Sequence, residues 1–244
     1  GDTLTITSGS ITLTPAQLAG LSLTPPANFN GNIALTVTAI ATDGSAAPAS
    51  TTSTLNVTVN PVVDLTGADD SATTNEDTAV TASVTANDST TSGGTLTYAK
   101  TTDPLHGSVT VNPDGSYTYT PTGNYSGADS FTYTVTDVAS GESLTRTVNL
   151  TVTPVSDTPT LSVSGSGDED TAIPLTITPA LTDTDGSETL AIEISGLPVG
   201  SVLTNTAGDT LTITSGSITL TPAQLAGLSL TPPANFNGNI ALTV

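Results

Sequence analysis

The stretch NYSGADSFTYTVTD, residues Asn124–Asp137, contains the alternation that decides the fold. In its second half, Phe131, Tyr133 and Val135 alternate with threonines, so apolar side chains fall on one face of an extended chain and hydroxyls on the other. The same period of two recurs in TLTIT, LNVTV, SYTYT and VNLTVT, with Gly, Pro, Asn and Asp between the runs. Many short strands separated by turns predict an all-β fold of tandem antiparallel β-sandwiches, with about seven strands each and arranged end to end.

The chain begins and ends with one identical segment. Residues 1–37 and 208–244 both read GDTLTITSGSITLTPAQLAGLSLTPPANFNGNIALTV, at an offset of 207 residues. Because surface positions tolerate most substitutions, identity without a single change indicates a recent tandem duplication. We therefore expect the chain to be a window from a longer array. Within each copy, the motif TPAQLAG has a capping Thr, an early Pro and a final Gly, which predict a short helical turn.

Two similar linkers divide the chain. VTVNPVVD ends at Asp64 and LTVTPVSD ends at Asp157, and in both a Pro that cannot continue a strand ladder follows a β-rich run. We therefore predict three domains. These are the C-terminal part of a module A at residues 1–64, a complete module B at 65–157, and the N-terminal part of module A at 158–244.

The composition is strongly acidic. The 22 acidic residues face only Lys100 and Arg146 as cations, which gives a net charge of −20. Such a chain repels nucleic acid and anionic membranes, so we predict no nucleic-acid partner. No apolar run reaches the length of a membrane span, so we predict no membrane insertion. Because the chain has so few internal cations, dissolved metal ions are the expected partners of its carboxylates.

Several motifs together resemble a known group of proteins. They are NEDTAV and DEDTAI, DTDGSE, PDGSYTYTP, NYSGADSFTYTVTD and the two Pro-Val-x-Asp linkers. The set resembles the cadherin-like, immunoglobulin-like repeats in the long central regions of giant RTX adhesins that bacteria export by type I secretion. The resemblance implies calcium between consecutive domains, neighbouring repeats as partners, and a secreted or cell-surface location. It also implies an extender that projects a distal adhesive domain in adhesion or biofilm formation.

Strand order places acidic residues at the ends of the predicted sandwiches. At the junction from module B to module A, Glu76, Asp77 and Asp129 are expected to face Asp157, Asp183 and Asp185. At the other junction, Glu169 and Asp170 are expected to face Asp64, Asp88 and Asp137. Carboxylates without His or Cys select Ca²⁺. The predicted metal ligands are Asp43, Asp64, Glu76, Asp77, Asp88, Asp129, Asp137, Asp157, Glu169, Asp170, Asp183, Asp185 and Glu188.

Simpler interpretations remain open for some of these residues. Glu-Asp-Thr can shape a turn through hydrogen bonds to backbone amides, and Asp43 and Asp137 can be plain hairpin residues. DTDGSE resembles the start of an EF-hand loop but lacks its full spacing and its helices. His106 is interpreted as a surface loop residue, because no nucleophile elbow accompanies it. We therefore predict that the chain is not an enzyme.

Two other functions compete with the extender. One is a sandwich that itself binds a glycan or a protein; against it, Tyr117, Tyr119, Phe131 and Tyr133 alternate as core-facing strand residues do. The other is a fibre that self-associates head to tail by strand complementation. Residues 158–244 lack the final strands that residues 38–60 provide in the other copy, so the end of one chain can complete the beginning of the next.

Overall fold

The structure is a computed structural model that describes residues 4–6 and 8–244. Residues 1–3 and 7, at the start of the predicted first domain, lie outside the described residues. Contacts group the chain into two compact units. Unit 1 comprises Gly1–Ala68, Asn87–Thr97 and Val135–Leu144, and unit 2 comprises Asp69–Ala86, Tyr98–Thr134 and Thr145–Val244. None of the described helical elements exceeds four residues, so no described helix is long enough to cross a membrane.

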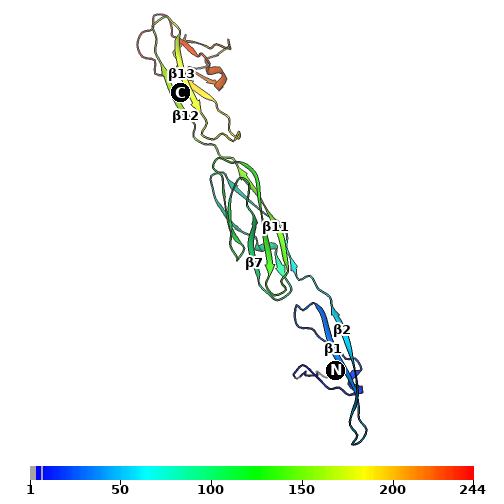
Figure 1. Cartoon of the computed structure of the whole chain (residues 1–244). Helices are drawn as coiled ribbons and strands as arrows, with labels where there is room; N and C mark the ends of the chain where they lie inside the picture. Colours follow the sequence, from blue (N-terminus) through cyan, green and yellow to red (C-terminus); the bar gives the residue numbers. More distant parts are fainter. Residues whose placement is uncertain (1–3, 7) are drawn as a thin grey trace. The chain divides into compact units, whose positions relative to one another are not determined.

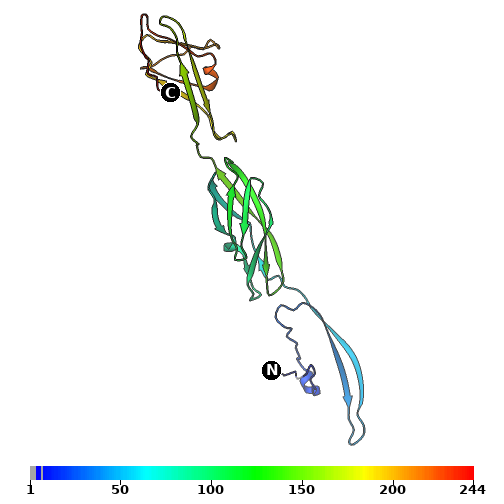
Figure 2. The same cartoon turned by 60° about the vertical axis from the view of Figure 1, so that its left-hand side comes forward.

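The main element of unit 1 is a long hairpin of strands β1 (Gly31–Ala41) and β2 (Ala49–Val59), drawn in blue and cyan in Figure 2. The strands pair antiparallel along their whole length, with Leu35 opposite Leu55. Alternating apolar residues and threonines suit a pleated ladder, and Gly44 supplies the positive φ that the turn needs.

A short 3-10 helix, η1 (Pro15–Leu18), precedes this hairpin. Gln17 Oε1 accepts hydrogen bonds from the backbone N–H and the hydroxyl of Thr14, which forms a capping box. The identical sequence forms η3 (Pro222–Leu225) in unit 2, with the same cap made by Thr221 and Gln224. The predicted helical turn is therefore confirmed in both copies.

Module B is built mainly from two sheets (Figure 1). One sheet has the order β4-β11-β10-β7 and the other β5-β9-β8. Their strands are β4 (Asp70–Asn75), β5 (Val80–Ser83), β7 (Leu96–Thr102), β8 (Gly107–Val111), β9 (Ser116–Pro121), β10 (Gly127–Asp137) and β11 (Ser143–Thr153). Tyr117 and Phe131, one from each sheet, pack edge to face at 5.2 Å between ring centroids. Tyr119 and Tyr133 are also fully buried, so the interpretation of all four as core residues is confirmed.

Module B has nine strands, against the expected seven or so. The two additional strands, β3 (Leu65–Thr66) and β6 (Ser89–Thr90), have two residues each and pair with one another, next to the 3-10 turn η2 (Thr85–Asn87). The first strand breaks after Thr66 and resumes as β4, which pairs in parallel with β11 from Asp70↔Val148 to Asn75↔Thr153. The sequence analysis did not anticipate this change of partner.

Module A in unit 2 forms a second sandwich. One sheet has the order β12-β13-β17-β15, and β14 pairs with β16. The strands are β12 (Thr160–Gly165), β13 (Ile173–Ala180), β14 (Ile192–Ser195), β15 (Val202–Thr204), β16 (Ser217–Leu220) and β17 (Ser229–Thr231). Its core includes Ile194, Leu220 and Leu228, none more than 2% exposed.

Candidate metal centre

Glu76 follows β4 and binds the linker after module B. Its backbone N–H donates to Thr153 O at 3.0 Å, which continues the β4–β11 ladder. Its Oε1 accepts a hydrogen bond from Val155 N. The side chain is 4% exposed, and Oε2 is buried with no hydrogen-bond partner among the described residues. Burial of a carboxylate oxygen without a hydrogen bond costs free energy, so a bound ligand at this atom would be stabilising.

Asp183 and Asp185 are held by the turn that contains them. Asp183 Oδ1 accepts from Asp185 N at 2.9 Å, and its Oδ2 accepts from Ser187 Oγ at 3.1 Å. Asp185 Oδ1 accepts from Ser187 N at 2.7 Å. Gly186 takes a φ of +96°, a conformation that L side chains rarely adopt. The turn therefore fixes both carboxylates, and Asp183 is only 1% exposed.

Glu76, Asp183 and Asp185 come together in unit 2. Each brings one carboxylate oxygen to within 4.8 Å of the others, and Glu76 and Asp183 are buried. Three negative groups this close repel one another unless a cation lies among them. All the donors are hard oxygen atoms, which suit Ca²⁺. The residues present therefore fit a calcium ion, and the orphaned Oε2 of Glu76 is the observation that favours one.

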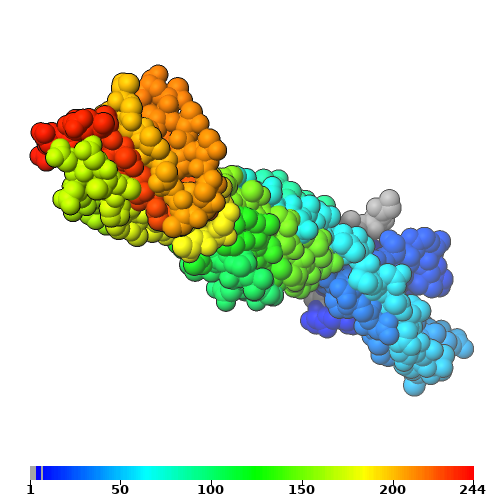
Figure 3. Space-filling model, turned by 90° about the horizontal axis from the view of Figure 1, so that it is seen from above, coloured from blue at the N-terminus to red at the C-terminus, as the bar shows by residue number. Residues whose placement is uncertain are grey.

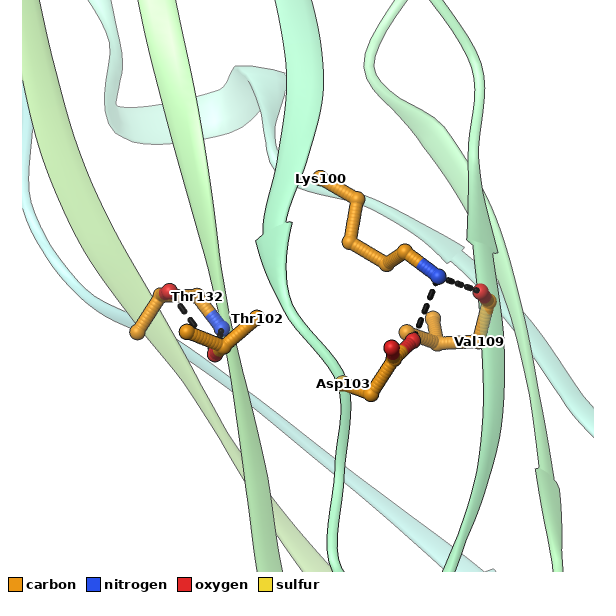
Figure 4. A network of polar contacts seen from close by, with 5 residues as sticks. All are labelled: Lys100, Thr102, Asp103, Val109 and Thr132. Atoms are coloured by element: carbon orange, nitrogen blue, oxygen red, sulfur yellow. Dashed lines mark hydrogen bonds and ion pairs between the residues drawn. The ribbon is translucent and has the colours of Figure 1, made fainter.

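Lys100 and Arg146, the two basic residues of the chain, make contacts outside the acidic cluster. Lys100 Nζ lies 2.5 Å from Asp103 Oδ1 and 3.3 Å from Val109 O, as Figure 4 shows. Arg146 donates to Thr145 O at 3.1 Å. Neither contact involves the acidic cluster.

The NYSG corner of module B bonds to module A within unit 2. Asp185 Oδ2 accepts from Ser126 N at 2.9 Å and from Ser126 Oγ at 2.7 Å, and this hydroxyl holds the pKa of Asp185 well below its usual value. Asn124 Nδ2 donates to Thr182 O at 3.2 Å and to Asp157 Oδ2 at 3.4 Å. The turn that carries Asp185 is therefore attached to the preceding sandwich.

Glu188 repeats the arrangement of Glu76 from the other side of the linker. Its Oε1 accepts from Asp157 N, and its Oε2 is buried without a hydrogen-bond partner among the described residues. A cavity of about 310 Å³ beside the linker is lined by Asp157, Leu181 and Glu188, among others. Two glutamates thus hold the linker by the N–H groups of Val155 and Asp157, and each keeps one oxygen available.

The linker that ends at Asp64 has a related clamp in unit 1. Glu142 Oε2 accepts from Asp64 N at 2.9 Å and from Leu65 N at 2.8 Å. Asp64 Oδ1 accepts from Thr91 Oγ1 at 2.7 Å. The loops that contain Glu142 and Glu188 therefore play the same role at successive linkers.

Asp137 is fully buried in unit 1 and saturated with donors. Hydrogen bonds from the hydroxyls of Ser92 and Thr90 hold its pKa well below the usual value, and Ser140 Oγ and Ala139 N donate to it as well. These bonds organise the β10–β11 turn. Their pattern matches the hairpin interpretation that the sequence left open.

Asp129 is likewise saturated. Its carboxylate accepts from the N–H groups of Leu105, His106 and Ser130 and from Tyr119 Oη, at 2.8 to 3.0 Å. Burial works to raise the pKa of Asp129, and the N–H donors outweigh this and hold it below the usual value. Among the described residues, the cluster with Asp183 and Asp185 contains Glu76 and not Asp129.

The other predicted ligands take separate places. Asp77 Oδ1 accepts from Asn124 N at 2.9 Å, and Asp170 Oδ1 accepts from Asn235 N at 2.8 Å, so both Glu-Asp-Thr aspartates hold the corner of their own sandwich. Glu169 is exposed, Asp43 is exposed in the β1–β2 turn, and Asp88 lies between η2 and β6. For all these residues, metal ligation stays a prediction.

Sequence reasoning missed Glu142, Asn124 and Ser126. A signal for Glu142 was present, because both SGE in module B and GSE in module A place a Glu just after a loop Gly. Asn124 and Ser126 belong to a quoted motif, but their contacts depend on tertiary structure that the motif does not specify.

Part of the chain matches a known family of domains. Residues 63–154 match the family model of the bacterial cadherin-like domain. The match supports the cadherin-like resemblance for module B, and with the antiparallel sheets it confirms the all-β sandwich fold. No curated protein matches the chain.

Solved structures of two endo-fucoidan hydrolases from glycoside hydrolase family 107 are similar to the chain at a low level. MfFcnA9 is 19% identical with a TM-score of 0.27, over 53% of this chain and 23% of that one. MfFcnA4 is 16% identical with a TM-score of 0.30, over 87% of this chain and 31% of that one. The chain thus spans less than a third of the length of these structures.

These neighbours contradict the prediction that the chain is not an enzyme, because they are structures of enzymes. The prediction was based on the absence of a nucleophile motif around His106, and the absence of one motif does not exclude other catalytic arrangements. At such low TM-scores the likeness transfers no substrate and no catalytic residue to this chain.

Proposed function

We propose that the chain is an extender segment of a bacterial surface adhesin, in which Ca²⁺ stiffens the joint between consecutive β-sandwiches. The observation that carries the proposal is the buried Oε2 of Glu76, which has no hydrogen-bond partner among the residues that the structure describes and lies beside the carboxylates of Asp183 and Asp185. The cadherin-like match at residues 63–154 supports an adhesin-type, extracellular setting. Secretion by a type I system and a role in biofilms follow from the resemblance and are parts of the proposal.

Calcium would connect the two sandwiches at the junction between module B and module A in unit 2. Glu76 belongs to module B, whereas Asp183 and Asp185 belong to module A, so one ion bound by all three would connect the two sandwiches. The joint already has hydrogen bonds from Asn124 and Ser126 across it and a linker held by Glu76 and Glu188. Ca²⁺ usually takes about six to eight oxygen ligands, so the remaining positions would be filled by water or by nearby carbonyl groups.

Calorimetric titration of Ca²⁺ into the chelator-treated full chain tests the proposal. We expect Glu76→Gln to weaken binding at one site at least about tenfold, because it removes a charged ligand from a buried position. The control is Glu193→Gln on the exposed face of β14, which should leave the titration unchanged. The absence of calcium binding in the unmodified chain, or equal affinity in the Glu76→Gln variant, would refute the site.

The stiffening is tested separately by small-angle scattering of the full chain with calcium and with chelator. We expect calcium to narrow the distribution of particle dimensions, and Glu76→Gln to abolish this narrowing. If calcium binds but the distribution does not change, the ion has a different role.

A further inference from the structure

Three corners in the chain share one backbone conformation. They read NFNG at residues 28–31, NYSG at 124–127 and NFNG at 235–238. The first Asn of each corner has a φ of 57° or 58°, and the final Gly has a φ between 116° and 135°. L side chains rarely adopt the conformation of this Gly, so the corner requires Gly at its end, whichever residue comes before it.

The third residue of the corner differs between the modules. It is Ser126 in module B, and it is Asn30 and Asn237 in the two copies of module A. The dipeptide Asn-Gly occurs in the sequence at these two corners and nowhere else. Because module B forms the same corner with Ser, the backbone conformation does not require the Asn.

An Asn that precedes Gly loses its side-chain amide more readily than an Asn that precedes other residues. The backbone nitrogen of the Gly attacks Cγ of the Asn, a bond forms between these atoms, and the Cγ–Nδ2 bond breaks with release of ammonia. Water then opens the resulting succinimide at either carbonyl, which gives aspartate or isoaspartate. Gly has no Cβ to hinder the approach to its nitrogen. The reaction consumes only water, so it needs no enzyme.

Both Asn-Gly pairs are accessible to water. Asn30, Gly31, Asn237 and Gly238 are exposed, and a Cβ built at either Gly would meet no atom within 4 Å apart from its chain neighbours. In Figure 3, the end of the chain, in red, which includes the second pair, lies at the surface of unit 2. The complete sandwich of module B has the same arrangement, because Gly127 is also exposed there. The corner is therefore a surface feature of the sandwich.

We propose that Asn30 and Asn237 deamidate spontaneously, so that module A acquires a new carboxylate at each of these corners as the protein ages. Each event adds to the net charge of the chain, which already stands at −20. Aspartate keeps the path of the main chain, whereas isoaspartate routes it through Cβ and lengthens it at the residue before β1. Gly31 pairs with Val59 in that strand, so the isoaspartate product shifts the start of the ladder.

The corner also lies where modules meet. In unit 2, Ser126 donates from its N and Oγ to Asp185 of module A. In unit 1, Asn28 Nδ2 donates to Ser92 O of module B at 3.4 Å. The corner therefore offers donors to acceptors of the following module. Deamidation removes a donor from the third position and adds a charge that repels such acceptors, which weakens the contact.

Peptide mass spectrometry of the full chain, aged in water labelled with heavy oxygen, tests the proposal. Digestion on the N-terminal side of aspartates separates the two copies, because one peptide begins at Asp2 and the other at Asp209. We expect the label to enter at Asn30 and Asn237. Its uptake should be faster as the pH rises, because the attacking nitrogen must lose its proton.

Substitution by the residue of module B provides the matched control. Asn30→Ser with Asn237→Ser should keep the corner, as Ser126 does, and should take up no label at either position. Asn32, which lies in β1 and precedes Ile33, should keep its amide in every sample. Intact amides at both corners of the unmodified chain, or equal label at Asn32, would overturn the proposal. Uptake is expected with calcium and with chelator alike, so its failure and the failure of the calcium proposal are separate outcomes.

Hydrogen exchange of residues 89–92 tests the effect on the contact between the modules in unit 1. Asn30→Asp imitates the aspartate product, and Asn30→Ser is its uncharged counterpart. We expect faster exchange in the Asp variant, because its carboxylate repels the acceptor at Ser92 to which the corner bonds. Equal exchange in the two variants would overturn this effect.

Discussion

At the scale of single residues, burial and hydrogen bonding divide the acidic side chains into two kinds. Asp129 and Asp137 have their oxygens filled by N–H and O–H donors of the same chain. Glu76 and Glu188 each use one oxygen on a linker amide, and the other oxygen is buried with no hydrogen-bond partner in the described part of the chain. The first kind stabilises the fold directly, and the second kind calls for a ligand.

Truncation of Asp129 tests its structural role. Asp129→Ala leaves the N–H groups of Leu105 and His106 without their acceptor. We expect the free energy of unfolding to fall by about 2–4 kcal/mol, because these part-buried amides and the buried hydroxyl of Tyr119 lose charge-assisted hydrogen bonds. Urea unfolding followed by tyrosine fluorescence measures this change.

The control is Asp103→Ala, which removes the ion pair with Lys100 shown in Figure 4. Asp103 is 72% exposed, and an exposed pair contributes at most about 1 kcal/mol. Equal losses in the two variants would show that the hydrogen bonds of Asp129 contribute no more to stability than an exposed ion pair does.

Asp137 is expected to make the free energy of unfolding depend on pH in the acidic range. Its folded-state pKa lies below the ordinary value of about 3.9, so its contribution is complete above that value and is lost as the pH falls through it toward the folded pKa. We expect the free energy of unfolding to be steady from neutral pH to about pH 5 and to decline below about pH 4. Unfolding by urea at a series of pH values measures this decline, and Asp137→Asn should make it shallower. An unchanged slope in that variant would contradict the assignment.

At the scale of elements, the duplicated segment separates local from tertiary causes of structure. The 3-10 helices η1 and η3 form in both copies, because the Thr and Gln of the capping box lie within one turn. Strands behave differently: Ser217–Leu220 forms β16, whereas the same residues at 10–13 form no strand, with only a single bridge at Ser10. A strand needs a partner for its backbone groups, and among the described residues β14 pairs with this segment in the second copy.

Matched leucine substitutions test this reasoning. Leu230→Ala removes a side chain that is 2% exposed, and Leu23→Ala removes its counterpart that is 42% exposed. We expect the first to destabilise by about 2–5 kcal/mol and the second by under about 1 kcal/mol, although the local sequences are identical. Hydrogen exchange of each segment, measured at low protein concentration, reports the two effects separately. Similar losses would mean that both copies are packed alike.

At the scale of the whole molecule, the net charge of −20 makes stability sensitive to cations. Monovalent salt screens the repulsion between exposed carboxylates without occupying a site. We expect calcium to raise the melting temperature even in high salt. Salt screens a bound ion and its partly buried ligands much less than it screens exposed carboxylates. With a dissociation constant near 10⁻⁴ M, a hundredfold excess of calcium adds about 2.7 kcal/mol per site. If high salt removed the effect of calcium, general screening would explain it.

The sequence predicted the fold well, because alternation identified the buried faces of β9 and β10. It also assigned Glu76, Asp183 and Asp185 to one junction, and the structure brings their carboxylates together, while metal ligation by them stays a prediction. It did not separate Asp129 from this group, because the donors that fill its carboxylate come from the loop at residues 105–106, distant in the sequence. The break between β3 and β4 also depends on which strand lies alongside, and a single sequence does not state this.

The parallel ladder of β4 and β11 has a mechanical consequence under the proposed extender role. These two strands lie at opposite ends of module B in the sequence, and six residue pairs join them, from Asp70↔Val148 to Asn75↔Thr153. Tension applied to the two ends of the module would drag the strands past one another, so all the rungs would be sheared together and not opened one at a time. Such a module resists pulling until the whole ladder fails at once, which suits a tether that is stretched by flowing liquid.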